Sequence, residues 1–182
     1  MKQKLALVSG VLGIGNYVVL IITLLKTNAS VSFATFLLWA ALALIVTINT
    51  MLVKGNYALP LGYLLGAIAT TFILLCKKQY GWSTVEWFTL VLVAACIIVW
   101  LTSGPGPAII ACSTAAFIAG VPQLKTAWDA PHSIAIPIWI GFLLANILAC
   151  FAGKDWSAKE RLYSGSAAVY CALVIGFALL PR

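Results

Sequence analysis

Charged residues are scarce in this chain. Lys, Arg, Asp and Glu make up 8% of its 182 residues, and only four are acidic. None of these carboxylates falls in the middle of an apolar segment, where ion-coupled carriers usually keep one. The acids, each near a segment end or in a connection, are Glu86, Asp129, Asp155 and Glu160.

Familiar catalytic patterns are also absent. The chain has a single histidine, His132, and lacks a Ser/His/Asp set, an H-E-x-x-H motif and a Gly-rich phosphate loop after a strand. The seventh apolar run has no lysine for a retinal Schiff base. The cysteines show no C-x-x-C spacing, and we interpret them as small fillers of helix interfaces rather than metal ligands or disulfides. We therefore predict that the protein is not an enzyme and needs no cofactor or metal.

Apolar residues, in contrast, are abundant. They form 63% of the chain, and the mean hydropathy is +1.08. A bilayer core about 30 Å thick takes roughly 20 apolar residues per helix, whereas a membrane β-barrel would show short segments of alternating polarity. The chain has seven long runs: Leu5 to Leu25, Val31 to Leu52, Ala58 to Cys76, Thr84 to Thr102, Pro107 to Thr126, Ser133 to Ala152, and Leu162 to Leu180.

These runs predict an all-α, polytopic membrane protein with seven transmembrane helices. We expect it to lie in a bacterial inner membrane or an equivalent cell membrane. The first run, after Met1 to Lys4, is too long for a secretory signal and lacks a small-residue cleavage site, so it reads as a retained helix.

The net charge of +7 is spread over nearly every connection. No basic stripe interleaved with aromatic residues occurs, so we expect the lysines and arginines to lie beside the lipid bilayer and not to bind nucleic acid. Six basic residues fall on the same side of the membrane as the N-terminus and five on the other side, so their count does not predict how the chain is oriented in the membrane.

An internal repeat relates the two halves of the chain. Laying Leu25-Lys26-Thr27 on Leu124-Lys125-Thr126, with a one-residue insertion in the later copy, places Trp39 on Trp139. Each half then has one further apolar run, and the run Thr84 to Thr102 is left over as a linker. This predicts a 3+1+3 organisation of two parallel triple-helix bundles, residues 1–80 and 105–182, joined by a linker helix in residues 81–104.

A proline and an amide interrupt the fifth apolar run, in Gly120-Val121-Pro122-Gln123. Proline removes one backbone donor and clashes with the carbonyl four residues earlier, so the helix is loosened near Ile118, and Gly120 adds freedom. We predict a hinge at Gly120, Pro122 and Gln123. The alternative is a static kink that helps packing.

Together, the Pro-Gln pair, the Trp-bearing helix after it and the two triple-helix halves resemble the PQ-loop and SWEET-type transporter superfamily. The resemblance covers the architecture of the whole chain, but only Pro122 and Gln123 match the motif; the first copy has Ile22-Thr23-Leu24 there. It implies that the first helix of the second bundle bends during alternating access.

Polar and aromatic residues inside the apolar runs are the candidates for a binding pocket. Trp139 and Asn146 are seven residues apart, two helical turns on one face, and would offer a flat ring and an amide to one cavity. The alternative is that such residues only join helices. The predicted substrate-binding set is Asn16, Tyr17, Trp39, Asn49, Tyr63, Trp139, Asn146 and Tyr170.

These residues predict a transporter of a small, neutral, polar solute by alternating access. Sugar is the leading candidate, although the asparagines that SWEET-type carriers place on the last helix of each bundle are missing here, so an amino acid or another metabolite stays open. Asp129 is a candidate for proton coupling, and a homo-oligomer is open. A membrane receptor or a sorting or assembly factor on the same scaffold is the alternative function.

Overall fold

The computed structural model describes residues 2–26, 33–78 and 84–180, and every regular element in these ranges is a helix. The all-α expectation is confirmed. In chain order the helices are α1 (Lys2–Lys26), α2 (Phe33–Leu52), α3 (Ala58–Cys76), α4 (Thr84–Ser103), α5 (Pro105–Ala119), α6 (Val121–Asp129), η1 (Pro131–Ser133, a 3-10 turn), α7 (Ile136–Ala152) and α8 (Ala158–Leu179).

Five helical segments are long and apolar enough to cross a membrane: α1, α2, α3, the stretch Pro105–Asp129 that contains α5 and α6, and α8. Two shorter apolar helices cover Trp87–Ser103 and Ile136–Ala152. Large apolar side chains face outward, with Leu101 of α4 78% exposed and Leu7 of α1 66% exposed. An apolar exterior of this kind is unfavourable in water and suited to lipid, so the structure is compatible with an integral membrane protein.

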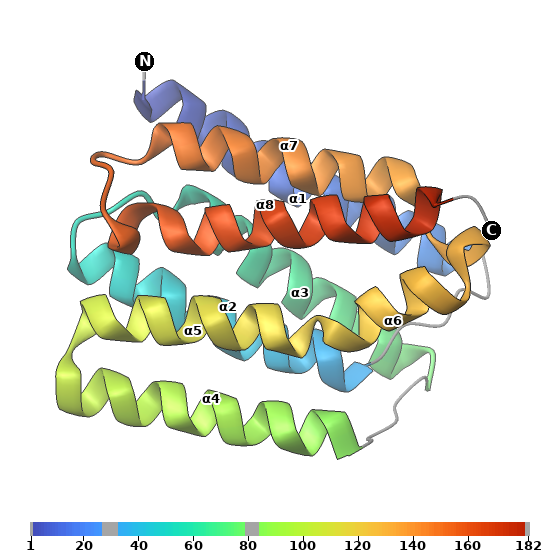
Figure 1. Cartoon of the computed structure of the whole chain (residues 1–182), viewed down its shortest axis with the longest axis horizontal. Helices are drawn as coiled ribbons and strands as arrows, with labels where there is room; N and C mark the ends of the chain where they lie inside the picture. Colours follow the sequence, from blue (N-terminus) through green and yellow to red (C-terminus); the bar gives the residue numbers. More distant parts are fainter. Residues whose placement is uncertain (1, 27–32, 79–83, 181–182) are drawn as a thin grey trace.

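The helices pack side by side in one bundle (Figure 1). α3 contacts both α1 and α2, and α8 contacts both α5 and α7. α4 contacts α5 and α2, whereas the remaining large contacts join α1 to α7 and α2 to α5. In Figure 1, α1, α3, α5 and α8 run in one direction and α2, α4 and α7 in the other.

Glycines let α1 and α3 approach closely. A Cβ on Gly62 would lie 2.9 Å from the carbonyl oxygen of Gly10, and one on Gly66 would lie 2.7 Å from Cβ of Tyr17. Gly62 and Gly66 form a G-x-x-x-G pattern, which lets the backbones of membrane helices pack against each other. This contact places Tyr17 against α3.

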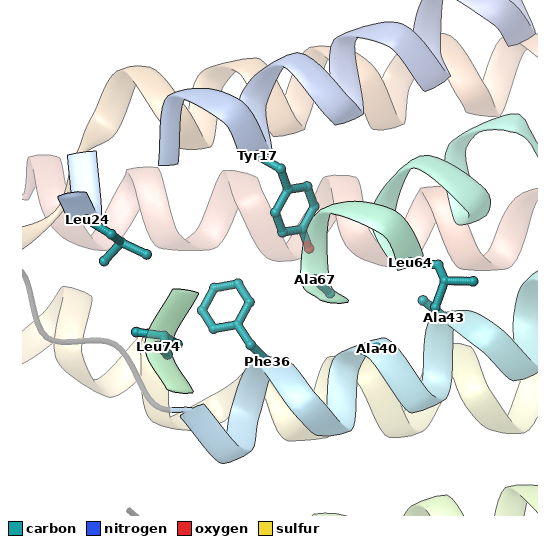
Figure 2. Close-up of a cluster of buried hydrophobic side chains, with 8 residues drawn as sticks. All are labelled: Tyr17, Leu24, Phe36, Ala40, Ala43, Leu64, Ala67 and Leu74. Carbon is teal, nitrogen blue, oxygen red and sulfur yellow. The ribbon is translucent and has the colours of Figure 1, made fainter. Parts of the chain in front are cut away.

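One buried cluster joins the first three helices (Figure 2). The ring of Tyr17, from α1, points toward that of Phe36, from α2, with centroids 6.4 Å apart in edge-to-face geometry. A second cluster joins α2, α4 and α5 and includes Leu42, Cys96 and Cys112. Buried cysteines fit the predicted role as small interior residues, but Cys76, at the end of α3, is exposed.

Candidate functional site

A cavity of about 450 Å³ lies among the helices. Its lining includes Thr23, Thr35 and Ser133, which lie where α1 ends and where α2 and α7 begin, and continues inward to Tyr63 and Asn146. Among the described residues that line it, none is Asp, Glu, Lys, Arg or His. Both halves of the chain contribute side chains, whereas α4 contributes none of the described lining.

Six aromatic rings in this lining form a closed circuit, which we call the six-ring cluster. Consecutive centroids lie 6.4, 5.6, 6.5, 5.7, 6.1 and 5.2 Å apart, and every contact is edge-to-face. Each such pair adds about 0.5–1.5 kcal/mol beyond its buried area, so the rings hold one another in place. In order around the circuit they are Tyr17, Phe36, Trp39, Tyr170, Trp139 and Phe142.

Asn146 lies at the inner end of the cavity. Its Nδ2 donates to the hydroxyl oxygen of Tyr63 at 2.6 Å and to the carbonyl of Phe142 at 2.8 Å. No group in the described part of the chain pairs with its buried Oδ1, or with the buried Nε1 of Trp39. A buried polar atom without a partner costs about 1–3 kcal/mol, so both atoms would gain from a ligand that pairs with them.

The structure therefore brings Tyr17, Trp39, Tyr63, Trp139, Asn146 and Tyr170 of the predicted set around one cavity. That they bind a substrate stays a prediction.

Two predicted site residues are not among the lining residues. Asn16 donates from Nδ2 to the carbonyl of Ile138 at 3.1 Å and so joins α1 to α7. Asn49 is fully buried and donates to the carbonyl of Ile45, one turn earlier, at 2.8 Å. Asn16 thus takes the helix-joining role that was the alternative interpretation of the sequence, whereas the hydrogen bond of Asn49 stays within α2.

The fifth predicted apolar run is interrupted at Gly120, between α5 and α6. Figure 1 shows α6 leaving the axis of α5. The Gly120 carbonyl accepts hydrogen bonds from the backbone N–H groups of Gln123 (2.9 Å) and Leu124 (3.2 Å) and from the hydroxyl of Tyr170 (2.9 Å). Gln123 also lines the cavity. The break is thus observed two residues before Pro122, whereas its motion stays a prediction.

Asp129, the candidate for proton coupling, is the last residue of α6. It is exposed and is not among the described residues that line the cavity. A coupling role for Asp129 stays a prediction, without support from a contact to the cavity.

At the end of the bundle opposite Thr23, Thr35 and Ser133, hydrogen bonds join three segments that are far apart in the sequence. Lys2 donates to the carbonyl of Lys154 at 2.8 Å, and Lys154 donates from Nζ to the carbonyl of Lys54 and from its backbone N–H to Glu160 at 3.1 Å. The start of α1, the turn after α2 and the turn before α8 are tied together in this way.

The same turn before α8 holds a carboxylate. Ser157 donates from its backbone N–H to Asp155 at 2.8 Å, and hydrogen bonding from Ser157 holds the pKa of the Asp155 carboxyl below its usual range.

Four aromatic residues of the lining, Phe36, Phe117, Phe142 and Tyr163, were missed from the sequence. A signal for two of them existed. Phe36 is three residues before Trp39, and Phe142 is three residues after Trp139, so each shares a helix face with a predicted site residue.

The fold and the cavity thus define a bundle of apolar helices around an uncharged, aromatic cavity. Comparison with protein-family models, curated proteins and solved structures finds no match to this chain. The resemblance to PQ-loop and SWEET-type transporters therefore stays a prediction from the sequence, based on Pro122, Gln123 and the predicted 3+1+3 organisation.

Proposed function

We propose that the chain is a multi-pass membrane transporter that carries a small, uncharged, polar solute by alternating access. The cavity carries this proposal. It lies inside the bundle, both halves line it, and its described lining has no Asp, Glu, Lys, Arg or His. Because a buried ion without a partner is strongly unfavourable, an uncharged solute fits best.

Two related halves joined by α4 are the architecture that we propose. If α1, α2 and α3 correspond to α5, α7 and α8, then the contact of α1 with α7 corresponds to that of α5 with α2. Likewise, α3 contacts both other helices of its half, and α8 does the same. Corresponding helices run in the same direction in Figure 1. These correspondences support a pseudo-two-fold axis along the membrane normal, as in parallel-repeat transporters.

Alternating access requires one side of the cavity to close while the other opens. The cavity lining reaches the end of the bundle at Thr23, Thr35 and Ser133. The other end is tied by Lys2 and Lys154. We assign the present arrangement to one of the two states of the cycle.

Motion about Gly120 would connect the solute to this cycle. Tyr170 lines the cavity and also donates to the Gly120 carbonyl, and Gln123 lines the cavity from the first turn of α6. A solute that displaced the Tyr170 ring would disturb the hydrogen bonding at the break. A rotation of α6 would in turn move Gln123 within the cavity.

The internal position of the cavity favours transport over the receptor or assembly-factor alternative, in which a peptide or protein would bind. The test is a thermal-shift screen of metabolites on the purified protein, followed by counterflow of each hit in proteoliposomes. Counterflow of an uncharged hit is expected. Hits that show no counterflow, together with capture of a peptide, would refute the proposal.

Pro122→Ala examines the hinge. Alanine restores a backbone N–H that a continuous α5–α6 helix needs, so we expect a straighter junction and at least about tenfold slower counterflow. Pro107→Ala is the matched control, because Pro107 is exposed in the first turn of α5, where a proline removes no helical hydrogen bond. Equal rates in the two variants would exclude the hinge.

A further inference from the structure

The described lining of the cavity is rich in aromatic rings. The six-ring cluster provides six of them, and Tyr63, Phe117 and Tyr163 add three more. Flat, unsaturated molecules stack on such rings irrespective of their exact substituents.

Two buried polar atoms in the lining have opposite requirements. Trp39 Nε1 can only donate a hydrogen bond, and Asn146 Oδ1 can only accept one. In the described part of the chain both lack a partner. A ligand that satisfies both must itself carry an acceptor and a donor, whereas a pure hydrocarbon would leave both atoms unpaired.

Several other polar groups of the lining are already engaged. Ser113 donates to the carbonyl of Ile109 at 2.6 Å, and Ser166 donates to that of Tyr163 at 3.1 Å. The Tyr170 hydroxyl donates to Gly120. A sugar, with hydroxyl groups around its whole rim, would therefore meet ring carbons over much of its surface.

A cation is a second class of ligand that aromatic residues can bind. In this cavity, however, the unpaired Trp39 Nε1 is a donor that a cation cannot satisfy, and the described lining has no carboxylate to balance a positive charge. An uncharged ligand avoids both problems.

We infer that the cavity binds an uncharged, planar heteroaromatic solute of one or two rings that carries both a donor and an acceptor. This inference names the solute class of the transporter proposed above and rests on that proposal. The volume of about 450 Å³ is within the range of small-molecule sites. The ligand stacks within the six-ring cluster, accepts from Trp39 Nε1 and donates to Asn146 Oδ1.

The test is equilibrium dialysis of the purified full chain against labelled uracil and labelled hypoxanthine, which have one and two rings and are uncharged at neutral pH. Glucose and choline are the comparison probes. We expect saturable binding of uracil or hypoxanthine, and weaker binding of glucose and choline by at least about tenfold.

Asn146→Leu and Trp39→Phe each remove one of the two polar atoms, and each should weaken uracil or hypoxanthine binding by roughly tenfold. Trp39→Phe keeps an aromatic ring and so provides a test if Asn146→Leu fails to fold. Asn49→Leu is the matched control: Asn49 is equally buried, also donates one turn back, also has an unpaired Oδ1 and is not among the lining residues. It should bind as the parent protein does.

The outcomes separate this inference from transport itself. Counterflow of glucose or choline without binding of uracil or hypoxanthine would overturn the solute class and leave transport in place. Binding of uracil or hypoxanthine without counterflow of either would support the class and refute transport. Equal weakening in Asn49→Leu and Asn146→Leu would also overturn the proposed contacts.

Discussion

The most direct test of the packing at the α5–α6 junction is the substitution Gly120→Ala. A Cβ at this position would lie 2.6 Å from Cζ and 2.8 Å from the hydroxyl oxygen of Tyr170. Both distances are too short for a real contact, so either the ring or the backbone must move. The Tyr170 ring is held by Phe117 at 5.8 Å and by Trp139 at 5.7 Å between centroids, which leaves it little room.

The expected change in the free energy of unfolding combines two destabilising effects and one stabilising effect. Overpacking in a dense interior costs about 1–3 kcal/mol. Loss of the hydrogen bond from Tyr170 to Gly120 costs about 1 kcal/mol. Replacing glycine by alanine in a helical conformation returns about 0.8 kcal/mol. We therefore expect Gly120→Ala to lower the free energy of unfolding by about 1–3 kcal/mol.

The assay is reversible denaturant unfolding in mixed micelles, followed by circular dichroism. Gly15→Ala is the control, because Gly15 lies within α1 and no atom lies within 4 Å of a Cβ placed there; it should be neutral or slightly stabilising. The double variant Gly120→Ala with Tyr170→Leu should be more stable than the two single effects predict. If Gly120→Ala matched Gly15→Ala in stability, the close packing of Tyr170 on the break would be refuted.

Three further predictions concern other contacts. Gly66→Ala would press a Cβ against Tyr17 and should destabilise by about 1–3 kcal/mol in the same unfolding assay; a neutral result would contradict the close α1–α3 approach. Gly141→Ala would place a Cβ 2.7 Å from Cγ of Asn16 and should lower the melting temperature. Adding Asn16→Ala to this variant should recover most of the lost melting temperature. If the two substitutions instead had additive effects on the melting temperature, the contact would be contradicted. The pKa of Asp155 is depressed in the folded state, so the ionised carboxylate stabilises the fold above its unfolded pKa, and this stabilisation is lost as the pH falls. Below about pH 4 the parent protein should therefore lose more thermal stability than Asp155→Asn. Parallel curves of melting temperature against pH would contradict this role of Asp155.

Helix positions were largely predictable from the sequence because long apolar runs end at polar or Gly/Pro residues. The run Ala58 to Cys76 has the bounds of α3, and the run Val31 to Leu52 begins two residues before α2. The break at Gly120 was expected from Pro122, since a proline cannot continue the hydrogen-bond ladder.

The direction in which individual side chains point was less predictable from the sequence. Asn16 and Tyr17 are neighbours in the middle of one apolar run, and both were expected at the pocket. A helix turns about 100° per residue, so Tyr17 lines the cavity while Asn16 bonds to Ile138 of α7. Which of the two faces the cavity depends on how α1 is rotated against α7. Gly141 packs against Asn16 and Gly66 packs against Tyr17, so contacts with residues distant in the sequence, and not the local pattern, set that rotation.

The six-ring cluster has a consequence for how the protein is made. The ribosome supplies Tyr17, Phe36 and Trp39 with α1 and α2, and the other three rings only with α7 and α8. Nascent chains generally fold from the N-terminal part first, and α1, α2 and α3 share a buried cluster of their own. The early helices can thus pack around an incomplete circuit, and the circuit closes only when α8 brings Tyr170 against Trp39 and Trp139.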